Sequence, residues 1–172
     1  MKAFLYSIIF TIASACMYGQ FYPLEAGVAG GISPGINFRA YLDENLSYEA
    51  LLSFRNEGFQ VHLIRQQHNE LKMTEEGNFY LLYGYGAHTG FYYTDHYSFF
   101  FRDIYFGRDV FTPVLGVDGF AALEFRFVEL PMSIALNYKP FMELSLRQFF
   151  GLNLWDFGLT VKYRFRPDNK YY

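Results

Sequence analysis

The residues best suited to catalysis lie in one aromatic-rich stretch of the chain. His96 and Ser98 are two residues apart, so in an extended segment their side chains would project from the same face. Asp103 and Asp109 follow and could orient the imidazole, as a third group does when a histidine activates a serine nucleophile. The corresponding chemistry would be hydrolysis. Because these residue types meet easily by chance in a polar loop, we expect them not to be catalytic.

Three further histidines could bind a metal ion. His62, His68 and His88 occur near Gln60 and Gln66. Their spacing on separate strands predicts no specific metal geometry. We therefore expect hydrogen bonds within a protein interior, and neither a metal nor another cofactor.

The first twenty residues have the features of an export signal. Lys2 is the charged start, residues 3–13 are apolar, and small residues follow. The apolar run is too short to span a membrane as a helix. Cys16, the single cysteine of the sequence, lies in a weak lipoprotein-processing pattern. We expect ordinary cleavage near Gly19 or Gln20 instead, which leaves 1–20 as a secretory signal and 21–172 as the mature domain.

Composition limits the function classes that remain. The chain has 172 residues, enough for one domain, and its 14 basic and 17 acidic residues form no runs. No basic stripe is present to bind phosphates, so we expect no nucleic-acid partner. Aromatic residues make up 22% of the sequence, more than a soluble domain of this size can hide. Something apolar should therefore cover part of its outside.

Strict alternation of apolar and polar residues predicts strands throughout the mature chain. Trp155, Phe157, Leu159, Val161, Tyr163 and Phe165 share one parity, while polar residues or glycine occupy the positions between them. Eleven alternating residues match the length of a tilted membrane strand. The pattern predicts eight strands, at 24–32, 35–43, 47–56, 58–68, 78–90, 114–127, 132–140 and 155–165. All six prolines lie at ends of these segments or in turns, as expected of a residue that cannot donate to a sheet ladder.

The charges indicate which face of such a sheet points inward. The polar parity carries five acids and six bases, which nearly balance: Glu25, Arg39, Glu49, Arg55, Asp118, Glu124, Arg126, Lys139, Asp156, Lys162 and Arg164. Opposite charges can pair inside a closed barrel, while the apolar parity forms the nearly unbroken band that lipid contact requires. We therefore predict an all-β, eight-stranded antiparallel up-and-down transmembrane β-barrel whose lumen side chains fill. The alternative is a soluble, lipocalin-like ligand-binding barrel, whose interior would have to hold the bulky apolar residues.

The signal segment, the eight strands and the ending from Phe157 to Phe165 resemble small outer-membrane barrels of the OmpA/OmpX type in Gram-negative bacteria. The resemblance implies a monomer in the outer membrane with both termini periplasmic, in contact with lipid and lipopolysaccharide. Gly158, Val161, Tyr163 and Phe165 resemble the signal read by the barrel-assembly machinery. The implied role is structural or surface interaction, without conduction and without enzyme activity. An alternative rests on the His96-x-Ser98 element, which resembles that of outer-membrane lipid A deacylases, although Phe99 stands where those enzymes have Asn.

This topology assigns the connections to the two sides of the membrane. We expect periplasmic turns at 43–46, 69–77 and 128–131. Outside loops are expected at 32–35, 56–58, 91–113 and 140–152. The long 91–113 loop, ten of whose residues between Phe91 and Thr112 are aromatic, is either a contact surface or an extension of two strands beyond the membrane. We favour the extension.

Overall fold

The protein is an antiparallel, all-β structure. The computed structural model describes residues 24–55, 58–99, 102–145 and 150–165, with the backbone alone for 93–99 and 102–110. The strands are β1 (Leu24–Gly31), β2 (Gly35–Asp43), β3 (Leu46–Arg55), β4 (Gly58–Met73), β5 (Gly77–Phe99), β6 (Arg102–Phe127), β7 (Met132–Tyr138), β8 (Phe141–Ser145), β9 (Gly151–Asn153) and β10 (Phe157–Arg164). Within these residues no helix has the length and apolar character needed to cross a membrane. The expected signal, 1–20, lies outside the described residues.

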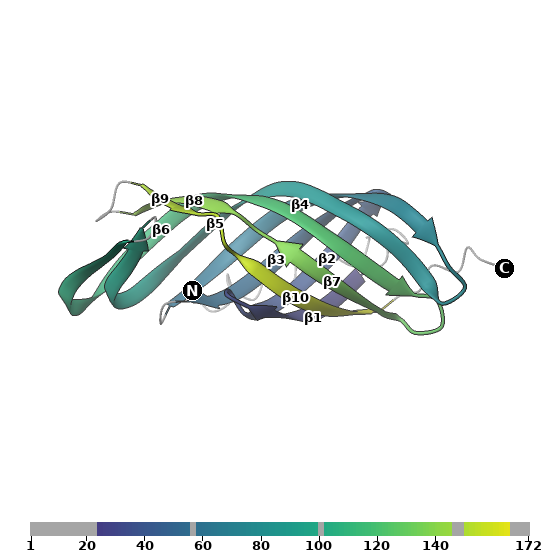
Figure 1. The fold of residues 1–172 in the computed structure, drawn as a ribbon, viewed down its shortest axis with the longest axis horizontal. Helices are drawn as coiled ribbons and strands as arrows, with labels where there is room; N and C mark the ends of the chain where they lie inside the picture. The colour runs from purple at the N-terminus through teal and green to yellow at the C-terminus, as the bar shows by residue number, and fades with distance from the viewer. Residues whose placement is uncertain (1–23, 56–57, 100–101, 146–149, 166–172) are drawn as a thin grey trace, which may run out of the picture.

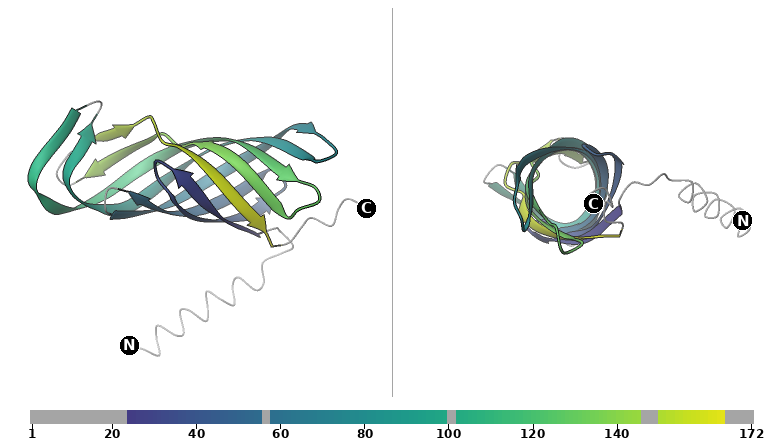
Figure 2. Two further views of the ribbon diagram at one scale, coloured as in Figure 1. Left: turned by 60° about the horizontal axis from the view of Figure 1, so that its bottom comes forward. Right: turned by 90° about the vertical axis from the view of Figure 1, so that its right-hand side faces the viewer.

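Eight of the strands close into a ring. The order β5-β4-β3-β2-β1-β10-β7-β6 returns to its start because β5 also pairs with β6. Seen along its axis, this strand ring is a closed circle (Figure 2). The first and last strands of the chain are neighbours in this ring. β1 pairs with β10, with Glu25 opposite Arg164 and Val28 opposite Val161. The predictions of an all-β fold and of eight antiparallel strands that close on themselves are confirmed.

Two strands beyond the predicted eight come from interruptions, which corrects the expected 140–152 loop. β7 and β8 pair with β6 in one continuous register, from Arg126 opposite Ser133 to Val114 opposite Ser145. Pro140 separates them because it has no N–H to donate, yet its carbonyl still accepts a hydrogen bond from Gly119 N at 2.7 Å. β9 pairs with β8 and precedes β10. The connection between β8 and β9 is therefore much shorter than expected.

The favoured extension of two strands through 91–113 is confirmed, because β5 and β6 stay paired as far as Phe99 and Arg102. The segment bounds predicted at 90 and 114 were therefore too short. This β5–β6 hairpin extends past the other strands at one end of the molecule (Figure 1). The predicted turn at 69–77 is too long, since β4 continues to Met73 and β5 begins at Gly77. In both places polar or aromatic residues broke the expected alternation while the backbone ladder continued.

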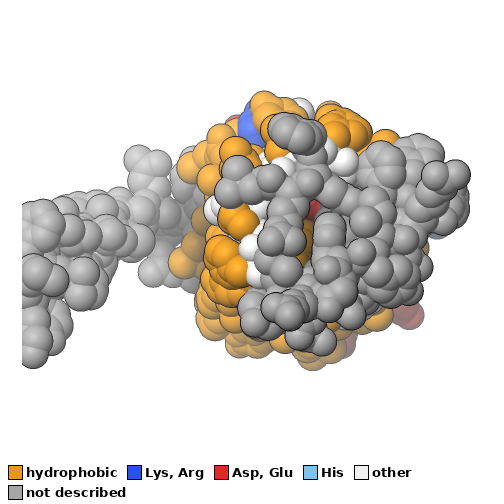
Figure 3. Space-filling model, turned by 90° about the vertical axis from the view of Figure 1, so that its left-hand side faces the viewer, with side chains coloured by type: hydrophobic (Ala, Val, Ile, Leu, Met, Phe, Trp, Pro, Cys, Tyr) orange, Lys and Arg blue, Asp and Glu red, His pale blue; other side chains and the backbone are white. Residues whose placement is uncertain are grey.

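The outer wall of the strand ring is apolar. Its exposed side chains include Phe38, Leu63, Tyr85, Leu115 and Leu136, each between 57% and 65% exposed. Hydrophobic side chains cover most of the described wall when the molecule is viewed from the β5–β6 hairpin end (Figure 3). Inside, a small apolar layer formed by Ile64, Leu82, Phe120 and Ala122 is fully enclosed. The distribution of apolar side chains is thus the reverse of that in a soluble domain.

Candidate functional site

The interior of the strand ring holds two groups of polar side chains, with the apolar layer between them. Their positions follow from the period of two along each strand. On β6 the inward residues are Asp118, Phe120, Ala122 and Glu124 in succession. Asp118 belongs to one polar group and Glu124 to the other. We call them the histidine cluster and the arginine cluster.

The arginine cluster is centred on Arg39, which is 1% exposed. Its guanidinium forms salt bridges to Glu25 and Glu49 at 3.1 Å and to Glu124 at 2.6 Å. The same three carboxylates bind further cations: Arg126 at 2.6 Å from Glu124, Lys162 at 2.8 Å from Glu49, and Arg164 at 3.1 Å from Glu25. Each buried carboxylate therefore has at least two cationic partners, which compensates the cost of removing it from water.

Contacts of the arginine cluster cross the interior of the strand ring. Arg39 lies on β2 and Glu124 on β6, strands that are not neighbours in the ring order. The guanidinium of Arg126 also lies 3.9 Å from the centre of the Tyr80 aromatic ring. Side chains thus meet in the middle of the interior and fill it at this level, as expected of eight strands.

The histidine cluster joins three adjacent strands at the other level. His62 on β4 lies opposite His88 on β5. Their Nδ1 atoms lie 3.1 and 2.9 Å from the two carboxylate oxygens of Asp118, on β6. His62, His88 and Asp118 are each no more than 3% exposed. Gly116 makes room for this group, because a Cβ there would collide with the His88 imidazole.

A serine completes a chain of contacts through His62. Ser53 Oγ lies 2.9 Å from His62 Nε2, and His62 Nδ1 faces Asp118. This is the order of contacts found in serine hydrolases, where the imidazole takes the proton of the hydroxyl. Here Ser53 is fully enclosed, and Lys139 Nζ also lies 3.3 Å from His62 Nε2. A substrate carbonyl has no room beside Ser53, so the contacts act as an interior hydrogen-bond network.

A cavity of about 30 Å³ lies elsewhere in the interior. Asn37, Glu49, Lys139 and Asp156 are among its lining residues, whereas Ser53 and His62 are not. A water needs roughly 10–15 Å³ of such space, so this cavity has room for a water or two. Its lining also includes apolar residues such as Leu51 and Phe120, and its volume is too small for an organic ligand.

The eleven charged residues of the predicted inward parity can now be located. Eight are nearly fully buried, at 6% exposure or less: Glu25, Arg39, Glu49, Asp118, Glu124, Lys139, Asp156 and Lys162. Arg126 and Arg164 are partly buried, and Arg55 stacks on the Phe141 aromatic ring at 5.0 Å. Lys139 pairs with Asp156 at 3.4 Å. These side chains therefore fall into separate groups at different levels and do not form one network.

The other predicted residues are placed as follows. His96 and Ser98 lie on β5 and Asp103 and Asp109 on β6, with Ser98 opposite Asp103 in the ladder. Their side chains lie outside the described part of the structure. Gly158, Val161 and Tyr163 lie on β10, followed by Phe165, and the two aromatic side chains are about half exposed on the outer wall.

Sequence reasoning placed His62, His68 and His88 inside but did not bring two of them together with Asp118. It also missed Ser53, Tyr92 and Glu143 as interior partners; Tyr92 donates a hydrogen bond to Glu143 at 2.8 Å. Glu143 was assigned to a loop, and its alternation with the apolar residues Met142 and Leu144 was the available signal. His68 is separate from the other two, since it contacts Ser47 and Arg126 in the arginine cluster.

Comparisons with protein-family models, with curated proteins and with solved structures found no match.

Proposed function

We propose that this protein is an eight-stranded, OmpA/OmpX-type β-barrel of the outer membrane, with a structural or surface-interaction role and a non-conducting interior. The observation that carries the proposal is the reversed polarity of the strand ring. Buried salt bridges occupy its interior, and large apolar side chains cover its wall. Lipid tails would cover that wall without loss of backbone hydrogen bonds, because the closed ladder satisfies them.

The composition of the wall supports contact with lipid. Along β6, Leu115, Val117 and Leu123 are 45–61% exposed, while Asp118 and Glu124, which directly follow Val117 and Leu123, are buried. In water, such a face would be a large apolar patch. In a bilayer it would lie in the hydrocarbon region, so the strands of the closed ring would cross the membrane.

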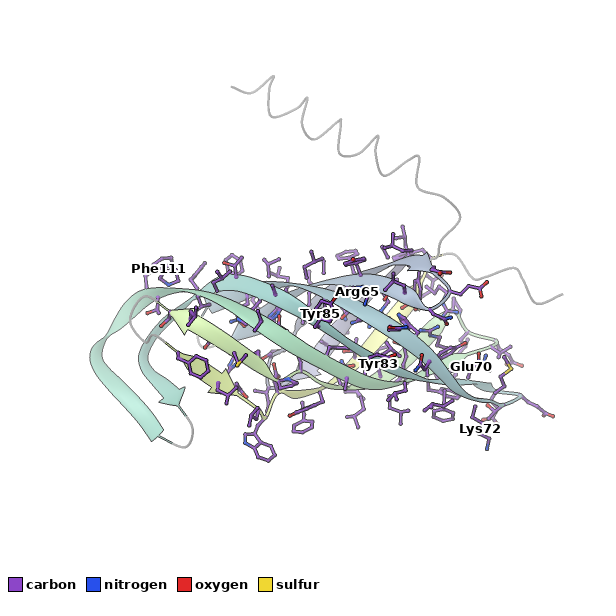
Figure 4. The ribbon with its side chains drawn as sticks, turned by 90° about the horizontal axis from the view of Figure 1, so that it is seen from above. Arg65, Glu70, Lys72, Tyr83, Tyr85 and Phe111 are labelled. Atoms are coloured by element: carbon purple, nitrogen blue, oxygen red, sulfur yellow. The ribbon has the colours of Figure 1, made fainter. Side chains whose placement is uncertain are left out.

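Arg65 interrupts the apolar wall. Its guanidinium lies 5.9 Å from the centre of the Tyr85 aromatic ring, and both residues are on the outward parity (Figure 4). In the ladder Arg65 is opposite Tyr48, two residues after the start of β3 at the turn between β2 and β3. Arg65 itself lies at the middle of β4 and near mid-length of the ring (Figure 4). In a membrane its cation would lie against the Tyr85 aromatic ring, and its long side chain would extend along the wall toward water or phosphate.

The interior supports a role without conduction. Arg39 and Glu124 meet across it, and Ile64, Leu82, Phe120 and Ala122 form an apolar layer beside them. Both features favour an interior without a continuous water path. The same side chains argue against a lipocalin-like ligand-binding barrel, which would need an apolar interior with room for a ligand.

The proposal is tested by single-cysteine labelling along β6. Cysteines are placed one at a time from 117 to 124 in a Cys16→Ser background, and cells are treated with a lipid-soluble thiol reagent. We expect reaction at the outward positions 117, 121 and 123, and exclusion at 118, 120, 122 and 124. The wild-type protein should fractionate with the outer membrane and migrate faster on gels before heating than after.

Two outcomes would contradict the proposal. Recovery of the protein as a soluble species would exclude membrane insertion. A labelling profile that is flat, or that favours the even positions, would return the soluble ligand-binding barrel as the better account. Single-channel recordings test the interior separately, and a stable open conductance would overturn the non-conducting interior alone.

A further inference from the structure

We propose that His62, His88 and Asp118 form a binding site for a divalent transition-metal ion inside the strand ring. Their ligand atoms, one from each residue, all lie within 4.8 Å of one another, and all three side chains are buried. Two imidazole nitrogens with one carboxylate suit first-row ions such as Zn²⁺, Co²⁺ or Fe²⁺. The inference does not depend on the membrane location.

Two of the separations between donor atoms are close to those in a coordination shell. His62 Nδ1 and His88 Nδ1 lie 3.1 and 2.9 Å from the two Asp118 oxygens. Ligands bound at about 2.0–2.1 Å from a zinc ion are roughly 3.3 Å from their neighbours in a tetrahedral shell. The two separations from Asp118 are close to this value, whereas the widest separation among the three donor atoms, up to 4.8 Å, would have to shorten when an ion binds.

His62 has the hydrogen-bond partner expected of a metal ligand, and His88 has a carboxylate near enough to become one. A metal-bound imidazole usually donates its second ring N–H to an acceptor, which fixes its orientation. The second nitrogen of His62 lies 2.9 Å from Ser53 Oγ, and that of His88 lies 3.6 Å from Glu143 Oε2. If the Nδ1 atoms bind the metal, His62 can donate to Ser53 and His88 to Glu143. Lys139 Nζ would then turn from His62 to its other partner, Asp156.

The charge of Asp118 gives an independent reason for a cation here. The carboxylates of the arginine cluster each bind arginine or lysine, whereas Asp118 forms no salt bridge to either residue type within the described part of the chain. A buried carboxylate is costly without a positive partner. Either a proton on an imidazole or a metal ion can supply that charge, and the two possibilities make different predictions.

Binding would link three neighbouring strands at one point. His62 comes from β4, His88 from β5 and Asp118 from β6. The last two strands form the long β5–β6 hairpin. Both imidazoles must be free of a proton at Nδ1 to bind, so metal uptake would release any proton held there. Because the site is enclosed, the metal would enter during folding.

The experiment is to fold the full chain from urea into detergent micelles in the presence of Co²⁺, remove free metal, and record metal content and visible absorption. We expect one Co²⁺ per chain, with d–d absorption bands that Zn²⁺ abolishes by displacement. Asp118→Asn and His62→Ala should each lower the affinity at least tenfold. Ser53→Ala, which removes the acceptor behind His62, should lower it about 10- to 100-fold.

His68→Ala is the matched control, since His68 is another buried interior histidine but belongs to the arginine cluster. It should retain one Co²⁺ per chain with an unchanged spectrum. Absence of bound Co²⁺ in the folded wild-type protein would overturn the proposal and assign the charge opposite Asp118 to a proton. Equal loss of Co²⁺ in His68→Ala and His62→Ala would also overturn it. The wild-type measurement decides the question even if a variant fails to fold, and gel migration before heating reports folding in every case.

Discussion

Replacement of Glu124 by glutamine tests whether the interior charges of the strand ring hold it together. Glu124 is fully buried, and its carboxylate contacts Arg39 and Arg126, each at 2.6 Å, with Lys162 at 3.9 Å. Glutamine keeps the shape of the side chain but removes its charge. The arginine cluster then holds four cations against two carboxylates, Glu25 and Glu49.

The expected loss can be estimated from the geometry. Two unit charges about 4 Å apart interact by about 4 kcal/mol at an effective dielectric constant of about 20. Glu124 loses two such close partners, but Arg39 keeps Glu25 and Glu49, and relief of carboxylate desolvation offsets part of the loss. Removing one partner from a buried ion pair typically costs about 3–5 kcal/mol, and we expect Glu124→Gln to fall in this range. That is a large share of a total stability of about 5–15 kcal/mol.

The assay is urea unfolding in detergent or lipid vesicles, followed by the fluorescence of Trp155. This residue is the single tryptophan of the chain and is 63% exposed on the outer wall, so its environment changes when the strands leave lipid or detergent. Glu75→Gln is the matched control, because Glu75 is exposed in the turn between β4 and β5. It should leave the unfolding midpoint almost unchanged. If Glu124→Gln shifts the midpoint no more than Glu75→Gln does, the charges are not holding the interior together and the reasoning fails.

Three further substitutions test other parts of the structure. Leu123→Arg places a charge on the outer wall in β6. Near the membrane centre it should lower the free energy of unfolding in lipid vesicles by about 2–4 kcal/mol. An unchanged urea midpoint would contradict lipid contact at this position. Arg65→Leu should raise the free energy of unfolding in the same assay by about 2–4 kcal/mol, because Arg65 lies on the outer wall at the middle of β4 (Figure 4). An unchanged urea midpoint would contradict this and show that its cation reaches the membrane surface. Gly116→Ala should lower the unfolding midpoint, because the added Cβ collides with the His88 imidazole and with the carbonyl of Met142 across the ladder. Gly30→Ala is its control, since a Cβ there lies 4.0 Å from its nearest neighbour, and equal effects of the two changes would refute the reason given.

The alternation of side chains is a local property, and the sequence alone was enough to use it. In a strand, successive residues point to opposite faces whatever the strand pairs with, so the pattern around Leu123 and Glu124 already separated outer from inner positions. The prolines marked the ends of the predicted segments for an equally local reason. The extra length of β5 and β6 and the presence of β8 and β9 were harder to predict. β8 and β9 are short, and the hairpin ends of β5 and β6 carry aromatic and charged residues on both parities.

The partners inside the ring were decided only by the tertiary structure. Arg39 and Glu124 are 85 residues apart, and their contact depends on the order in which eight strands close. His62, His88 and Asp118 meet because the β4–β5 and β5–β6 ladders hold particular registers. Register shifts interrupt these ladders, between Glu70 and Lys72 and between Thr94 and His96, and each changes the partner of every residue beyond it. The periodicity of a strand determines which face a histidine occupies, but only the register between strands determines which carboxylate it meets.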